Sequence, residues 1–137
     1  MINPPIEYSE RTCWTGAVVD ALMAKITDVC LLHGSCSVML TGGRTAARLY
    51  RAMASSKEFS QIRQVNFYFG DERCVPPDHP DSNFDMAMRT LFKHGVPASC
   101  NVIRMLGELP DNTAAAKAYE ANLPPKIDVL LLSVGED

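Results

Sequence analysis

The sequence predicts an α/β fold, with a mostly parallel sheet and helices on both of its faces, on three observations. Short apolar segments alternate along the chain with segments of helical periodicity. Three of the apolar segments, near residues 38, 65 and 128, end at a glycine. The last of them, residues 127–134, is almost continuously apolar, which is typical of a strand inside a parallel sheet. Such alternation is characteristic of right-handed βαβ units.

Length and composition favour one globular domain over residues 1–137. The chain has 137 residues, of which 47% are hydrophobic and 21% charged, enough for a core of its own. Its net charge of −3 gives no reason to expect a nucleic-acid or anionic-membrane partner. The longest apolar runs are too short to span a bilayer. We therefore expect a small-molecule ligand, and the composition does not predict an oligomeric state.

The cysteines indicate a reducing compartment. There are five of them, an odd number, and no two have the CxxC spacing of a zinc or redox site. Free thiols are then expected rather than a disulfide framework or a metal site. The first twelve residues lack the basic start and apolar core of a signal peptide. These observations predict a cytoplasmic protein.

The amino-terminal part predicts an extended arm, or a short edge strand, over residues 1–11, followed by a long helix. Val18, Leu22, Ile26 and Val29 recur at spacings of three and four, so the helix is expected from Thr12 to Leu32. The His-Gly pair that follows is a usual helix stop.

A glycine-rich turn follows the first predicted strand, residues 37–40, and precedes a helix over residues 45–57. It reads Thr41-Gly42-Gly43-Arg44-Thr45. Two glycines allow a tight turn whose N–H groups lie at the positive end of the next helix, which favours an anion by about 0.3–1 kcal/mol. The turn matches neither GxxxxGK[ST] nor GxGxxG, so it predicts no nucleotide. On its own, the pattern fits a plain strand-to-helix connection equally well.

The second predicted strand, Val65–Phe69, ends at Gly70 and is followed at once by Asp71, Glu72 and Arg73. Ligands of α/β proteins bind beyond the carboxyl ends of the strands, so both signs of charge are expected at a ligand. A solvated loop with a surface ion pair has the same local pattern.

The remaining elements complete the alternation. Ser82 with Asp85 resembles a capping box and predicts a helix that runs to Gly95. A short strand is expected over residues 101–105, a helix over residues 113–123, and a strand covered on both faces over residues 127–134. The loops TGGRT, GDER and GED would then meet at one edge of the sheet, which favours a ligand site. Since the chain stops where a crossover helix would begin, we expect the amino-terminal part of a longer domain, or a fold completed by another chain.

Three motifs resemble those of the 6-phosphogluconolactonase family: SVMLTGGRTAARLY, VNFYFGDERCVPPDHPDSN and IDVLLLSVGED. The second is the most specific, because GDER, a Val-Pro turn and a DSN helix start occur in order. The third resembles the start of a family motif that continues into Gly-His and Ser-Leu-Phe-Pro. The resemblance covers nearly the whole chain but only the front of a family member. It implies a Rossmann-like fold, shared with glucosamine-6-phosphate deaminases, ribose-5-phosphate isomerases and CoA-transferases.

The resemblance also implies an activity. That activity is hydrolysis of 6-phospho-D-glucono-1,5-lactone to 6-phosphogluconate in the oxidative pentose phosphate pathway, with no metal and no organic cofactor. Carried over by motif, Gly42, Gly43 and Thr45 match the phosphate-facing turn, and Arg44 stands beside them. Asp71 and Arg73 match the substrate-facing acidic and basic residues. The family usually has Ser-Thr-Pro after the two glycines, where this chain has Arg-Thr-Ala.

One family feature is missing. The Gly-His motif, whose histidine is the general base implied by the resemblance, is not among the 137 residues. His33, His79 and His94 do not replace it by position, so we expect negligible lactonase activity from this chain alone. A phosphosugar deaminase or isomerase, and a non-catalytic sugar-phosphate binder, remain alternatives.

Overall fold

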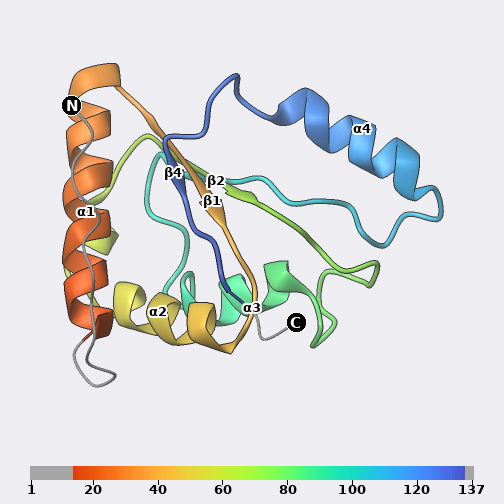
Figure 1. Ribbon diagram of the computed structural model, residues 1–137, viewed down its shortest axis with the longest axis horizontal. Helices are drawn as coiled ribbons and strands as arrows, with labels where there is room; N and C mark the ends of the chain where they lie inside the picture. The colour runs from red at the N-terminus through yellow and green to blue at the C-terminus, as the bar shows by residue number, and fades with distance from the viewer. Residues whose placement is uncertain (1–13, 135–137) are drawn as a thin grey trace.

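The structure is a computed structural model that describes residues 14–134. The predicted arm at residues 1–11 and the last glycine loop, residues 135–137, lie outside the described residues. Helices and strands alternate as predicted (Figure 1). In chain order the elements are α1 (Trp14–His33), β1 (Cys36–Leu40), α2 (Arg44–Ala54), the 3-10 helix η1 (Phe59–Gln61), β2 (Val65–Phe69), α3 (Asn83–Thr90), β3 (Asn101–Val102), α4 (Asn112–Asn122) and β4 (Val129–Leu130).

The strands form one parallel sheet in the order β3-β2-β1-β4. The longest ladder joins β1 to β2, from Cys36 opposite Val65 to Leu40 opposite Phe69. Because all these pairs are parallel, the carboxyl ends of the strands lie at the same edge of the sheet. The predicted α/β class is thus confirmed.

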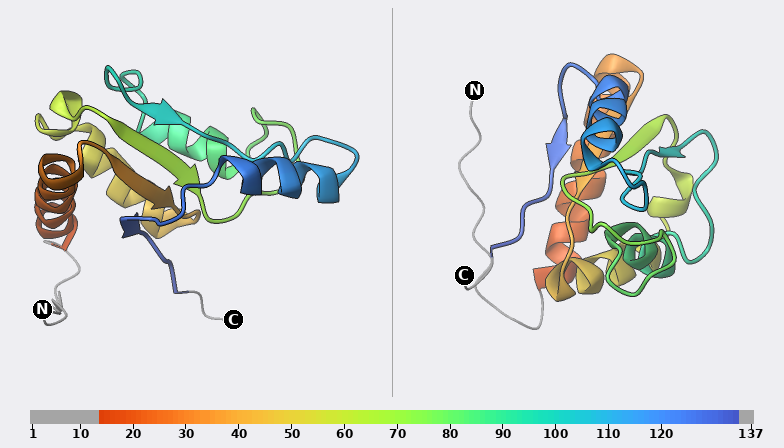
Figure 2. Two further views of the ribbon diagram at one scale, coloured as in Figure 1. Left: turned by 90° about the horizontal axis from the view of Figure 1, so that it is seen from above. Right: turned by 90° about the vertical axis from the view of Figure 1, so that its right-hand side faces the viewer.

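One face of the sheet packs against α1, α2 and α3. Val38 and Leu40 of β1, with Phe67 and Phe69 of β2, are at most 1% exposed and form one apolar cluster with these helices. From α1 this cluster takes the buried residues Val19, Met23, Ile26 and Val29. Of the four residues that predicted this helix, Ile26 and Val29 are buried, and Val18 and Leu22 are half-buried and pack against the cluster. In the left view of Figure 2 the two central strands lie between α1 and α4.

α4 lies apart from the other three helices (Figures 1 and 2). Its buried residues, Ala115 and Tyr119, stand outside the main cluster, and Tyr119 lies near Tyr68. Along β2 the side chain of Tyr68 points away from the face that Phe67 and Phe69 bury. The connection from β3 to β4 passes back across β2 and β1, so α4 belongs to the second face of the sheet.

Two strands are shorter than predicted, for a structural reason in each case. β3 ends at Val102 because the next bonding position on β2 is occupied: the Tyr119 hydroxyl accepts from the N–H of Phe69 at 2.7 Å and donates to its C=O at 2.8 Å. β4 is an edge strand that pairs only with β1 among the described residues. Coverage of this strand on both faces was wrong, since Leu130 is 52% and Leu132 78% exposed.

The base of β4 is nevertheless held firmly to β1. The Asp128 carboxylate accepts from the N–H of Ser37 at 2.9 Å and from its hydroxyl at 3.0 Å. These hydrogen bonds, the backbone one first, hold the pKa of Asp128 below its usual value. The start of β4 is therefore fixed by a charged side chain rather than by a long ladder.

Four cysteines lie in the described part of the chain, and all four are free thiols: Cys30, Cys36, Cys74 and Cys100. Burial raises the pKa of the Cys36 thiol to about 12, which makes it unreactive. Cys13 lies outside the described residues, and the cytoplasmic location stays a prediction. Between residues 14 and 134, no helix has the length and apolarity needed to cross a membrane.

Candidate functional site

The glycine turn after β1 and the acidic loop after β2 begin side by side. Leu40 and Phe69, the last residues of the two strands, are paired in register. One residue further, the N–H of Gly70 donates to the carbonyl of Leu40 at 2.9 Å. The segment Thr41–Thr45 therefore leaves the sheet next to the segment that carries Asp71 and Arg73. This is the juxtaposition that the sequence predicted.

The two segments are joined by Asn83, the first residue of α3. Its amide nitrogen donates to the backbone carbonyl of Asp71 at 3.1 Å and to the Asp71 carboxylate at 3.2 Å. The other side of the same amide lies against Gly42, where an added Cβ would collide with it. Asn83 is only 5% exposed. The sequence analysis did not identify Asn83 as a site residue, and its only signal was a place in the DSN helix start.

The first turn of α2 has no side-chain cap. Its N-cap is Gly43, with a φ of 97°, a left-handed conformation that glycine adopts without strain. The first three N–H groups of a helix have no partner inside the helix, and here no side chain of the described residues caps them. Arg44 and Thr45 are exposed around them. The turn therefore presents N–H groups, a hydroxyl and a guanidinium to solvent.

The base of this turn is rigid. The Tyr50 hydroxyl accepts from the N–H of Thr41 at 2.9 Å and donates to its C=O at 2.7 Å. Tyr50 is fully buried, and burial raises the pKa of its hydroxyl, so it stays protonated and able to donate. The Thr41 hydroxyl also lies 3.1 Å from that of Ser133. The segment after β4 is thus brought to the same place.

Glu72 is turned inward and fills the amino-terminal end of α3. Its carboxylate accepts from the N–H groups of Asn83 at 2.6 Å and Phe84 at 3.0 Å. It also accepts from the Ser82 hydroxyl at 3.0 Å and the N–H of Arg73 at 2.8 Å. Glu72, the middle residue of the charged triplet, therefore faces the start of α3 rather than solvent. Its carboxylate holds the loop after β2 to the first turn of α3.

Ser82 caps α3 as predicted, since its hydroxyl accepts from the N–H of Asp85 at 3.2 Å. The second half of the capping box differs. Asp85 does not reach back to the chain before the helix but pairs with Arg89 at 2.8 Å. The Ser82 N–H, which the second residue of a capping box would accept from, donates instead to the carbonyl of His79 at 2.9 Å.

Asp71 and Arg73 are exposed on either side of Glu72. The N–H of Arg73 donates to Glu72, and its carbonyl accepts from the N–H of Val75 at 2.9 Å and lies close to Gly107. Within residues 14–134 the guanidinium groups of Arg44 and Arg73 have no ion-pair partner. The guanidinium groups of Arg44 and Arg73 and the carboxylate of Asp71 are therefore exposed beside the glycine turn and the loop after β2.

The three histidines separate by their place in the fold. His33 ends α1 and His94 follows α3, each before a strand begins, so both lie toward the opposite edge of the sheet. His79 lies in the loop after β2, on the same edge as Asp71. Its Nδ1 accepts from the N–H of Asp81 at 3.1 Å, so the neutral ring carries its proton on Nε2. Neither nitrogen of that tautomer is a free base.

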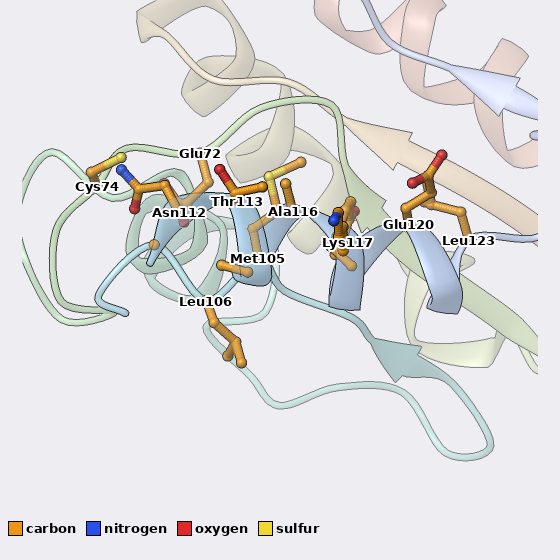
Figure 3. Close-up of a pocket in the computed structure, with 13 residues that line it drawn as sticks. Glu72, Cys74, Met105, Leu106, Asn112, Thr113, Ala116, Lys117, Glu120 and Leu123 are labelled. Carbon is orange, nitrogen blue, oxygen red and sulfur yellow. The ribbon is translucent and has the colours of Figure 1, made fainter. Parts of the chain in front are cut away.

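A groove of about 420 Å³ lies between α4 and the segment 105–107 (Figure 3). It is lined mainly by apolar side chains, with Glu72 and Cys74 at its border. The predicted residues Gly42, Gly43 and Asp71 are not among those that line it. A smaller cavity of about 220 Å³ lies beside the glycine turn, lined by Thr41, Thr45 and Ser133 among others. Within residues 14–134 no cluster of His, Cys, Asp and Glu side chains is arranged to hold a metal ion.

Comparison with known proteins places the chain in a family. Residues 10–137 match the model of the family described as glucosamine-6-phosphate isomerases/6-phosphogluconolactonase. A 6-phosphogluconolactonase of Nostoc sp. is 32% identical over 139 residues, covering 93% of this chain and 57% of that protein. One from Haemophilus influenzae is 33% identical, covering 87% of this chain and 54% of that protein.

The fold agrees with a solved relative. The crystal structure of 6-phosphogluconolactonase from Thermotoga maritima matches with a TM-score of 0.71 and 28% identity, covering 83% of this chain and 51% of that one. The chain thus spans about half the length of the curated relatives it matches.

Proposed function

The chain belongs to the glucosamine-6-phosphate isomerase/6-phosphogluconolactonase family, and on this premise we propose that it supplies the phosphosugar-binding part of a 6-phosphogluconolactonase. Such an enzyme hydrolyses the ring ester of 6-phospho-D-glucono-1,5-lactone to 6-phosphogluconate. One observation carries the proposal: an uncapped helix start and a loop with exposed Asp71 and Arg73 lie together and share the Asn83 side chain.

In this proposal the phosphate of the substrate binds at the glycine turn. The free N–H groups that follow Gly43 donate to the phosphate oxygens, and the α2 dipole favours the negative charge. The Thr45 hydroxyl and the Arg44 guanidinium add charge-assisted hydrogen bonds, each worth about 1.5–3 kcal/mol. Gly42 is required for a different reason, because its missing side chain makes room for Asn83.

Asp71 and Arg73 contact the sugar lactone. Attack of water on the lactone carbonyl places negative charge on the carbonyl oxygen, and a positioned donor such as the Arg73 guanidinium stabilises that charge. The Asp71 carboxylate accepts from the hydroxyls of the sugar. Glu72 keeps both neighbours in place without contacting the substrate itself.

The activation of water is the step for which these residues offer no group. A general base must lie within hydrogen-bond reach of the water and be unprotonated. His79 is the histidine at this edge, and its Nδ1 is already engaged by Asp81. We therefore keep the expectation that the 137-residue chain alone hydrolyses the lactone at a negligible rate. With half of its relatives' length covered, we also propose that residues 1–137 form one α/β unit of a longer lactonase domain.

Calorimetry with 6-phosphogluconate tests the binding step. We expect the wild-type chain to bind, and Arg73→Ala to lower the affinity by about 10–100-fold, because a charge-assisted bond is lost. Arg51→Ala is the matched control, since Arg51 is exposed in the last turn of α2, away from the open end. Equal losses for the two variants would count against the site.

Two further assays separate the alternatives. A coupled lactone-hydrolysis assay at a normal enzymatic rate would refute the expected inactivity of the chain alone. Stronger binding of glucosamine 6-phosphate than of 6-phosphogluconate would favour a deaminase or isomerase. Binding of 6-phosphogluconate without turnover by the whole natural protein would favour a non-catalytic binder.

A further inference from the structure

Asn83 occupies an unusual position, because one side-chain amide meets both halves of the candidate site. Its amide nitrogen faces two acceptors of the same residue, the carbonyl and the carboxylate of Asp71, at 3.1 and 3.2 Å. Since both partner atoms accept, the nitrogen must lie on that side and the amide oxygen on the other. The oxygen side is the one that lies against Gly42. The orientation of this amide is thus determined by chemistry.

The amide has little freedom to move. Asn83 is 5% exposed, and its own N–H is held by Glu72 at 2.6 Å. The space beside Gly42 is so narrow that a methyl group there would collide with the amide oxygen, carbon and nitrogen of Asn83. A displacement of the glycine turn toward Asn83 must therefore be transmitted to Asp71, and the reverse also holds.

We propose that Asn83 is a positioning residue that couples the glycine turn to Asp71, so that the phosphate-binding part and the sugar-contacting part of the site are set together. This inference rests on the proposed function for the identity of the ligand. The bridge itself rests only on the two hydrogen bonds and the close contact. Asn83 acts through Gly42 and Asp71 and does not contact the ligand.

A pair of ligands distinguishes positioning from a general structural role. Inorganic phosphate fills only the turn, whereas 6-phosphogluconate also reaches Asp71. In the whole natural protein, we expect Asn83→Ala to lower the affinity for 6-phosphogluconate about tenfold, while the affinity for inorganic phosphate falls less than about threefold. The near-isosteric Asn83→Asp should be at least as harmful, because it places a carboxylate against that of Asp71. Equal losses for both ligands would overturn the proposal.

A double-mutant cycle tests the contact with Gly42. We expect Gly42→Ala to weaken 6-phosphogluconate binding strongly in the wild type, since the new methyl group displaces the Asn83 amide. In the Asn83→Ala background the same change should cost less, because the colliding atoms are gone. Gly43→Ala is the matched control. Its Cβ would meet nothing within 4 Å and its cost comes from the φ of 97°, so it should add independently to Asn83→Ala.

The same double-mutant cycle can be measured by thermal unfolding, as changes in the free energy of unfolding, and then needs no ligand. If the wild type binds neither phosphate nor 6-phosphogluconate, the proposed function fails, and the unfolding cycle still decides whether the bridge exists. Strict additivity of Gly42→Ala and Asn83→Ala in unfolding would overturn the inference. The inference is supported if the unfolding free energies of Gly42→Ala and Asn83→Ala are coupled while those of Gly43→Ala and Asn83→Ala are additive.

Discussion

Two helices begin at the same edge of the sheet, and their first turns are built in opposite ways. α3 starts inside a set of protein acceptors, where Ser82 caps it and the Glu72 carboxylate binds its first N–H groups. α2 starts at Gly43 with no side-chain cap among the described residues. The two starts are neighbours, since Asn83 of α3 lies against Gly42.

The difference fits the proposed function, in which one helix start makes the loop rigid and the other binds the phosphate of the substrate. The N-terminus of a helix attracts negative charge wherever it occurs. At α3 the chain supplies that charge itself, with four hydrogen bonds to Glu72. At α2 no side chain of the described residues caps the first turn, and we propose that the phosphate of the substrate supplies the charge there. We interpret the capped start of α3 as the rigid support for the uncapped start of α2, which lies beside it.

The largest expected effect comes from removing the Glu72 carboxylate from the start of α3. Glu72→Gln replaces one acceptor oxygen with an amino group that faces N–H donors, so we expect the free energy of unfolding to fall by about 2–4 kcal/mol. Urea unfolding measures it. Glu120→Gln on the exposed surface of α4 is the matched control and should change stability by less than about 0.5 kcal/mol. A Glu72 variant as stable as this control would show that the cap contributes nothing.

Next in size are the two tyrosines that close the strand ends below these turns. Tyr119→Phe leaves the N–H and C=O of Phe69 without their hydroxyl partner, and Tyr50→Phe does the same at Thr41. We expect a loss of about 1–3 kcal/mol for each. Because Tyr50 lies below the open end, only its variant should also weaken 6-phosphogluconate binding strongly. Thermal unfolding and calorimetry of both variants check this, and a reversed order of binding losses would contradict it.

A carboxylate placed at the uncapped start of α2 should raise stability and lower the affinity for the ligand. Arg44→Glu places a carboxylate in the first turn of α2, where it gains about 0.3–1 kcal/mol from the helix dipole. The same charge repels phosphate, so we expect 6-phosphogluconate affinity to fall at least tenfold. Arg51→Glu, in the last turn, should lower stability slightly and leave affinity unchanged. Unaltered affinity in Arg44→Glu would show that α2 is not the phosphate site.

The smallest effect concerns an ion pair beside α3. Arg104 lies over the Phe84 ring and bonds to Glu108, and this hydrogen bond lowers the pKa of Glu108 from 4.5 to about 2. A carboxyl group with a lowered folded pKa stabilises the fold above its unfolded pKa and loses that contribution as pH falls. We expect the contribution to be present above about pH 4.5 and to disappear toward about pH 2.

Thermal unfolding at several pH values measures this contribution. Glu108→Gln should lower the melting temperature slightly at neutral pH and converge with the wild type in acid. A constant difference at every pH would exclude the ion pair as its cause.

Much of the fold was predictable because it depends on local patterns. The bounds of β2, Val65–Phe69, were predicted without error, since an apolar run between turn residues defines a buried strand. The end of β3 was not predictable. It depends on the Tyr119 hydroxyl, which reaches Phe69 from 50 residues away. Coverage of β4 likewise depends on what packs across the sheet rather than on its own apolar sequence.

The candidate site divides in the same way. The meeting of the glycine turn with the Asp71 loop followed from the rule that parallel strands end at one edge. The inward direction of Glu72 and the bridging role of Asn83 did not, because they depend on how residues 73–81 fold back to bring α3 beside the turn. In the sequence nothing distinguishes Glu72 from Asp71 and Arg73 as a residue that faces the protein. Only the path of residues 73–81 brings the start of α3 to the Glu72 carboxylate.

Residue-resolved NMR during titration with 6-phosphogluconate tests the central claim most directly. The claim is that the open start of α2 and the Asp71–Arg73 loop form one phosphosugar site. We expect the amide signals of Gly43, Arg44 and Asp71 to shift together with one dissociation constant, while that of Phe84, already bonded to Glu72, stays in place. Shifts confined to one of the two segments, or largest in the groove beside α4, would contradict the account.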